Sequence, residues 1–176
     1  AGSALAACPA MAQDAPTAIV ADMSNATSLG TRVAADGSVV LIGGGTVAGE
    51  NLFHSFAQFD LARGDSAVWQ APGEGAIANI VNRVTGDLPS RISGTIDTTA
   101  MPGADFWFIN PNGVLLGEGL RLDVPGASHF TTASQLQFTD GAMFSTRAAD
   151  GSTLSMASPA AFGFLGGEGD AALVGA

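Results

Sequence analysis

The chain has 176 residues, a length typical of a single domain. Its six basic and sixteen acidic residues give a net charge of −10, which excludes the basic surface that nucleic-acid binding requires and argues against an anionic membrane surface as partner. The single cysteine excludes a disulfide framework, and a hydrophobic fraction of 47% excludes a disordered chain.

The N-terminal residues are small and apolar and are typical of the end of a signal peptide. Ala10–Ala12, read as A-x-A before Gln13, fits the shallow pockets of signal peptidase. We therefore assign residues 1–12 to a residual signal-peptide region, used by the Sec machinery, and residues 13–176 to the mature domain. Two alternatives remain open: a lipobox ending at Cys8 and an untargeted coil.

Short apolar segments separated by Gly, Pro, Asp or Ser recur along the body of the chain, and each predicts a β-strand. The best helical window, residues 77–84, is short and rich in β-branched residues, so we expect an all-β protein. In chain order the predicted strands lie at residues 39–42, 51–61, 67–69, 76–84, 91–96, 105–109, 114–116, 120–124, 129–132, 136–138 and 142–144.

Two all-β architectures fit this pattern, an antiparallel sandwich or barrel and a parallel β-helix. The 24 glycines, the short strands and the closely spaced turns favour the β-helix. No strict repeat is readable, so the pattern alone leaves both architectures open.

The acidic residues and histidines have structural interpretations. Most Asp residues adjoin Gly at turns, where the carboxylate bonds backbone two residues on, and the regular array of a calcium-binding repeat is missing. His54 and His129 are far apart in the sequence and are predicted to be structural. Asp105 and Asp123 are the one candidate catalytic pair, on the assumption that they lie on neighbouring coils. We expect no enzymatic activity, cofactor or metal.

Two further groups of residues carry specific packing predictions. Phe53, Phe56 and Phe59 cannot share one face of a regular strand, so a bend or bulge near Ser55 is expected, with these rings in the core. The cations Arg83 and Arg91 are predicted to pair with turn carboxylates such as Asp87 or Asp97.

An ordered set of motifs identifies the chain more specifically. Together they resemble the N-terminal secretion domain, or haemagglutination activity domain, of filamentous-haemagglutinin-type two-partner-secretion exoproteins. The resemblance extends from about Ala35 to Leu165. It rests on NLFHSF at 51–56, NRVTG at 82–86, PSRISG at 89–94, FWFINPNGV at 106–114, Gly117 and PAAFGF at 159–164.

The resemblance implies a right-handed parallel β-helix with extra-helical strands and no catalysis. It implies that periplasmic POTRA domains of an outer-membrane transporter of the TpsB type bind the domain to start export, after which it folds outside a Gram-negative cell. The protein would then be secreted or held at the cell surface. The alternative is a surface adhesin that binds a host-cell glycan or protein through the β-helix face. Because domains of this family run longer, we expect truncation at the C-terminus.

The candidate recognition residues are those that match the family motifs. In the turn at 110–113, Pro111 fixes φ and Gly113 tolerates positive φ, so a purely structural corner is the competing interpretation. The full set is Asn110, Pro111, Asn112, Gly113, Asn51, Phe53, His54, Phe56, Arg83, Thr85 and Gly86.

Overall fold

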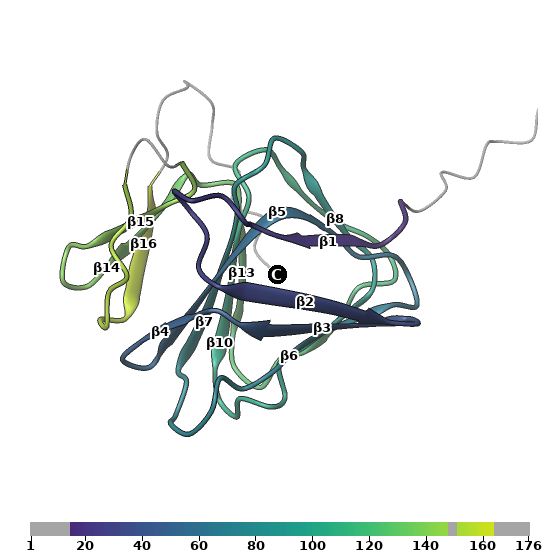
Figure 1. Cartoon of the computed structure of the whole chain (residues 1–176), viewed down its shortest axis with the longest axis horizontal. Helices are drawn as coiled ribbons and strands as arrows, with labels where there is room; N and C mark the ends of the chain where they lie inside the picture. The colour runs from purple at the N-terminus through teal and green to yellow at the C-terminus, as the bar shows by residue number, and fades with distance from the viewer. Residues whose placement is uncertain (1–14, 148–150, 164–176) are drawn as a thin grey trace, which may run out of the picture.

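The computed structural model of the chain describes residues 15–147 and 151–163, and in these ranges every regular element is a strand (Figure 1). The all-β prediction is confirmed. None of the described residues forms a helix long and apolar enough to cross a membrane. The strands are β1 (Ala18–Ala21), β2 (Thr31–Asp36), β3 (Val39–Gly44), β4 (Thr46–Ala48), β5 (Asn51–Asp60), β6 (Ser66–Trp69), β7 (Asn79–Val84), β8 (Ser90–Ile92), β9 (Thr95–Asp97), β10 (Asp105–Ile109), β11 (Val114–Leu116), β12 (Arg121–Asp123), β13 (Ser128–Thr131), β14 (Gln135–Phe138), β15 (Met143–Ser145) and β16 (Pro159–Gly163).

The chain winds into a β-solenoid whose faces are three parallel sheets. The first contains β5, β7, β10 and β13 side by side, the second β3, β6, β9 and β12, and the third β8 and β11. The residues Val39, Ser66, Thr95 and Arg121 are neighbours across the second sheet, so successive coils contain 27, 29 and 26 residues. The predicted β-helix is confirmed.

The solenoid interior is filled by apolar side chains stacked from coil to coil. Leu52, Ile80 and Phe106 are paired in register and fully buried. Trp69 lies 5.0 Å from Phe106 between ring centroids, in an edge-to-face arrangement. Its indole N–H donates to the side-chain oxygen of Asn82 at 2.9 Å, which satisfies a polar group inside the core.

Strand β5 contains a bulge near Ser55, as expected, but the bulge does not bring all three phenylalanine rings to one face. Ala21 of β1 pairs with Phe56 and Val20 pairs with Gln58, so Ala57 is the extra residue. The bulge lies two residues beyond Ser55. It turns both Phe56 and Phe59 into the solenoid interior, whereas Phe53 lies on the opposite face of the sheet.

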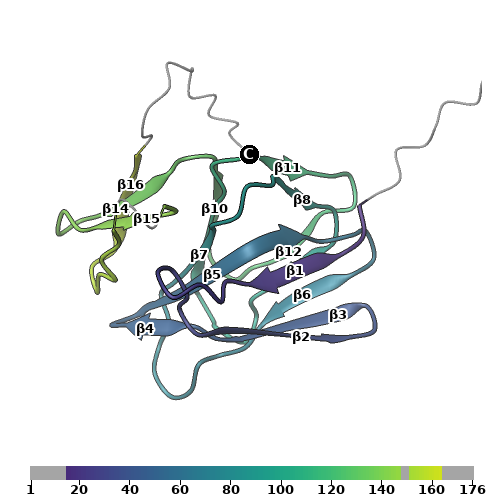
Figure 2. The same cartoon turned by 45° about the horizontal axis from the view of Figure 1, so that its top comes forward.

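Antiparallel strands cover the first coil of the solenoid (Figure 2). β1 and β4 pair with the two halves of β5, and β2 pairs with β3 through a tight turn at Gly37, whose φ is 59°. This cap occupies edges that would otherwise present unpaired backbone groups.

An antiparallel sheet of three strands lies outside the solenoid. Its order is β15-β14-β16, and it packs on the outer face of the first sheet. Phe53 contacts Phe144 at 5.0 Å and Phe138 at 5.9 Å between ring centroids. The expected extra-helical strands are therefore present.

The single strand predicted at residues 91–96 is wrong. The chain turns a corner at Ser93–Gly94 and forms β8 and β9 instead. A Cβ atom on Gly94 would lie 2.4 Å from the carbonyl oxygen of Asp65, so only glycine fits this corner. Strands β1, β2, β4 and β16 were not predicted.

Candidate functional site

The turn at residues 110–113 forms the corner between β10 and β11. Gly113 N–H donates to the carbonyl oxygen of Asn110 at 3.1 Å, and the φ of Gly113 is 126°. Asn112 N–H donates to the side-chain oxygen of Asn110 at 3.0 Å, which closes a second, Asx-type ring. The expected turn is present, with Pro111 at its second position.

This turn is bonded to the corner of the preceding coil. Asn112 Nδ2 donates to the Gly86 carbonyl at 2.7 Å, and Asn110 Nδ2 donates to the Leu88 carbonyl and Ser90 Oγ, both at 3.0 Å. Gly86 in turn packs on the coil below, where a Cβ atom would lie 2.1 Å from the Ala57 carbonyl. Two motifs separated in the sequence thus form adjacent corners of one column.

Arg83 is almost completely buried and joins three parts of the fold. Its Nε donates to Ser55 Oγ at 3.0 Å, and its Nη2 to the Thr27 carbonyl at 2.6 Å. Its Nη1 donates to the Ser145 carbonyl at 2.6 Å and to Ser152 Oγ at 2.8 Å. The guanidinium therefore links the solenoid, the N-terminal cap and the extra-helical sheet.

The predicted partners of Arg83 and Arg91 were wrong. The carboxylate that acts on Arg83 is Asp22, which reaches it through Ser55 Oγ, a donor to Asp22 Oδ2 at 2.9 Å. Burial lowers the pKa of Arg83 to about 10, and the nearby charge of Asp22 opposes that fall. The side chain of Arg91 is exposed, and the ion pairs formed among the described residues do not include it.

Asp22 is a buried carboxylate with several hydrogen-bond donors. Thr27 Oγ1 and Thr85 Oγ1 donate to Oδ2 at 2.5 and 3.1 Å, and Ser24 N–H donates to Oδ1 at 2.9 Å. Burial alone would raise the pKa of Asp22, but the hydrogen bonds from Thr27, Ser24 and Ser55 outweigh burial and lower it. Asp22 is ionised at neutral pH and balances the buried guanidinium.

Asn51 fixes the segment that leads into β16. Its Nδ2 donates to the carbonyl oxygens of Ser155 and Ala157 at 2.8 and 2.7 Å. Its side-chain oxygen accepts from Asn79 Nδ2 at 2.9 Å, and Asn79 accepts from Trp107 Nε1 at 3.1 Å. Asn51 therefore joins neighbouring coils to the extra-helical sheet.

His54 points into the solenoid beneath the cap and is fully buried. Its Nδ1 lies 3.2 Å from Thr31 Oγ1, and its Nε2 has no hydrogen-bond partner among the described residues. Burial lowers the pKa of His54 to about 4, so the ring is neutral at pH 7. Gly45 lies against the ring, where a Cβ atom would meet Cε1 at 2.8 Å.

Exposure divides the eleven candidate residues into two groups. Six are at most 2% exposed: Asn51, Phe53, His54, Phe56, Arg83 and Asn110. The other five lie at or near the surface: Thr85, Gly86, Pro111, Asn112 and Gly113. Asp22 and Thr27 were missed because they precede the segment that carries the resemblance.

The Asp105 and Asp123 pair is not formed. Asp105 lies in the first sheet and accepts Ala127 N–H at 2.8 Å, whereas Asp123 lies in the second sheet opposite Asp97.

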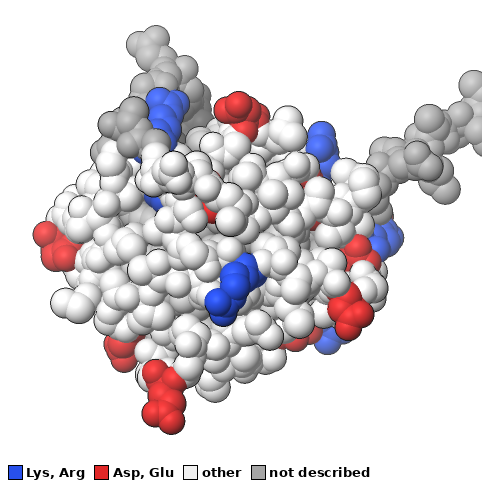
Figure 3. Space-filling view, viewed as in Figure 1, with Lys and Arg blue, Asp and Glu red and all other residues white. Residues whose placement is uncertain are grey.

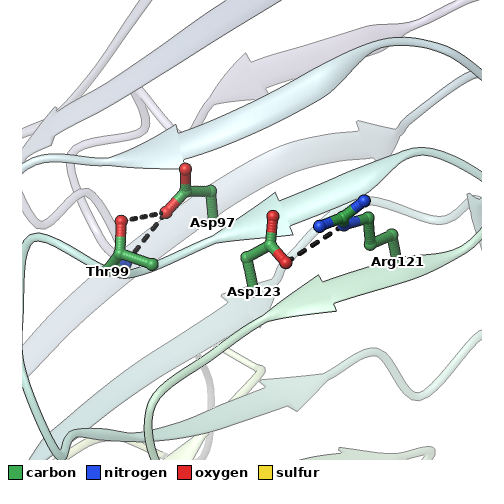
Figure 4. A network of polar contacts seen from close by, with 4 residues as sticks. All are labelled: Asp97, Thr99, Arg121 and Asp123. Atoms are coloured by element: carbon green, nitrogen blue, oxygen red, sulfur yellow. Dashed lines mark hydrogen bonds and ion pairs between the residues drawn. The ribbon is translucent and has the colours of Figure 1, made fainter.

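Figure 4 shows that local partners hold the two stacked carboxylates. Asp97 accepts from the backbone and the hydroxyl of Thr99, and Asp123 forms an ion pair with Arg121 at 3.1 Å. The described residues contain no cluster of three His, Cys, Asp or Glu side chains suited to a metal.

Comparison with protein families shows the family to which the chain belongs. The model of the TPS secretion domain matches residues 18–176. The chain belongs to the TPS secretion domain family. TPS domains belong to secreted two-partner-secretion exoproteins, whose partner is an outer-membrane transporter, and the domain serves secretion, not catalysis. None of the curated proteins matches the chain.

Proposed function

We propose that this TPS domain is recognised by the periplasmic POTRA domains of its transporter before it folds, and that folding outside the cell follows. The observation that carries the proposal is the burial of six of the eleven signature residues. A partner cannot contact buried side chains in the folded domain. If the transporter recognises these residues, it recognises them in an extended chain.

Strand addition is the mode of binding that suits such a chain. In this mode main-chain hydrogen bonds supply most of the affinity, and alternate side chains fill pockets. Strands β5, β7 and β10 are rich in β-branched and aromatic residues and match this requirement. A POTRA sheet edge would accept one of these segments, and the later pairing within the solenoid would release it.

Folding would also give transport a direction. The periplasm lacks ATP, and a solenoid can form coil by coil because each coil contacts only its neighbours. The bonds of Arg83 join the cap, the solenoid and the extra-helical sheet, so all three must be outside before they form. The folded domain then hides the residues that the transporter recognised.

The test is secretion with and without the co-expressed transporter, combined with proline substitutions in β5, β7 and β10. We expect transporter-dependent secretion, and weaker binding of the unfolded chain to isolated POTRA domains for at least one proline variant. Secretion independent of the transporter, or binding unchanged by every proline, would contradict the proposal. Binding to cells or glycans without any transporter effect would instead support a surface adhesin.

A further inference from the structure

An open groove separates β1 from β2 on the N-terminal cap. Its volume is about 800 Å³, and consecutive residues of both strands line it, Ile19–Ala21 and Thr31–Ala35. Successive strand residues point to opposite faces of a sheet, so an uninterrupted series shows that the strand edges border the groove. The wall is completed by Met23, Leu41, Gly43 and Gln70.

Both edges that border the groove lack a strand partner among the described residues. β1 pairs with β5 and β2 pairs with β3, and neither has a second strand neighbour there. Gly45 N–H donates to the Gly30 carbonyl, so these two residues form a hydrogen-bonded pair at the start of the β2–β3 ladder. From there along β2, residues whose backbone groups bond β3 alternate with residues whose backbone groups point the other way. Val33 and Ala35 therefore direct their backbone groups away from β3, toward the groove, where an added strand can pair with them.

Contacts to one residue join the two sides of the groove at one end. Asp22 N–H donates to the Ser55 carbonyl at 2.9 Å, and Ser55 N–H donates to Thr31 Oγ1 at 3.1 Å. β1 and β2 are thus both attached to Ser55 at one end and separate from there (Figure 1).

The charge of the groove indicates what kind of strand would bind. Among the described residues that line it, Arg32 alone is ionisable, and most of the others are apolar. Figure 3 shows a basic side chain amid a largely uncharged central surface, with acidic side chains toward the rim. In a protein with a net charge of −10, the positive charge of Arg32 in the lining favours a carboxylate on the incoming segment.

We propose that the groove binds an extended peptide segment of a partner protein. The segment adds a strand to the edge of β2, places small apolar side chains against the alanine-rich wall and directs an Asp or Glu to Arg32. This site belongs to the folded domain. It therefore goes beyond the proposed recognition of the unfolded chain and does not depend on it.

The test uses two fluorescein-labelled peptides, Ala-Val-Asp-Val-Ala and Ala-Val-Lys-Val-Ala, with the folded domain. We expect saturable binding of the Asp peptide to the wild type, weakened about fivefold or more by Arg32→Glu. The Lys peptide is expected to prefer the Arg32→Glu variant. Arg91→Glu, at an exposed arginine away from the groove, is the matched control and is expected to keep the wild-type preference.

A second variant tests the backbone pairing. Ala35→Pro removes a groove-facing N–H without removing a bond to β3. It is therefore expected to weaken binding of the Asp peptide although Arg32 is still present. Amide chemical-shift changes are expected to be confined to β1 and β2.

The proposal is overturned if the two peptides bind the wild type and the Arg32→Glu variant with equal affinity. It is overturned as well if the chemical-shift changes fall outside β1 and β2. It is also overturned if dilution of the domain alone produces the same shifts, which would make a second copy the occupant. If removal of residues 164–176 produces those chemical-shift changes, the occupant of the groove is the chain's own C-terminal segment instead.

Discussion

Asn112, at a corner, and Arg83, in a strand, both belong to the family signature, but they differ in exposure and in the number of hydrogen bonds that they donate. Asn112 is exposed and donates one long-range bond, to Gly86. Arg83 is buried and donates four, to the cap, the solenoid and the extra-helical sheet. The family signature therefore contains both residues that hold the fold together and residues that remain available to a partner.

The largest expected effect comes from removal of the buried guanidinium. Arg83→Met leaves the carbonyl groups of Thr27 and Ser145 without their donor and leaves the Asp22 carboxylate uncompensated. We expect a loss of about 3–5 kcal/mol in the free energy of unfolding, measured by urea denaturation. The exposed Arg91→Met is the control, with a change within about 0.5 kcal/mol. Equal effects of the two substitutions would contradict the comparison.

The next effect is a pH dependence that His54 produces. Its pKa is about 4 when folded and about 6.5 when unfolded, so the unfolded state binds more protons between these values. The contribution of His54 is fully present above pH 6.5 and is lost as pH falls toward 4, by roughly 3 kcal/mol. Denaturation at pH 7 and pH 5 should show a smaller difference for His54→Gln than for the wild type. An unchanged difference would exclude His54 as the cause.

Asn110 and Asn112 allow a comparison within one turn. Asn110→Ala removes the buried bonds to Leu88 and Ser90, with an expected loss of about 2 kcal/mol in the free energy of unfolding. Asn112→Ala removes an exposed bond, with an expected loss of about 0.5–1 kcal/mol.

Secretion assays of the same two variants separate folding from recognition. If secretion falls with stability, Asn110→Ala is secreted less than Asn112→Ala. A stable Asn112→Ala variant that is not secreted would instead make Asn112 a direct transporter contact.

Much of the strand pattern could be predicted because each strand is bounded by turn residues. The strand expected at 105–109 coincides with β10, and β-branched and aromatic enrichment was a sufficient signal there. The coil period was hidden because coils of 26 to 29 residues differ in loop length. β2 was missed since its outer residues are exposed, and the corner at Gly94 depends on contacts with the previous coil.

The arrangement around the candidate residues could not be predicted. The signature located Arg83 and Asn110, yet nothing in their sequence neighbourhood indicates that Thr27 or Ser145 supplies the acceptors. These partners lie 56 and 62 residues from Arg83. Such contacts depend on how coils stack, which local patterns do not encode.

Binding of isolated POTRA domains to folded and unfolded forms of the domain tests the central claim most directly. The wild type and the Arg83→Met variant would be compared at equal concentration by calorimetry, in urea that unfolds the variant but leaves the wild type folded, with the folded Arg91→Met variant as control. The account predicts that the unfolded variant binds and that both folded proteins do not. Binding of the folded wild type at least as tight as that of the unfolded variant would contradict it.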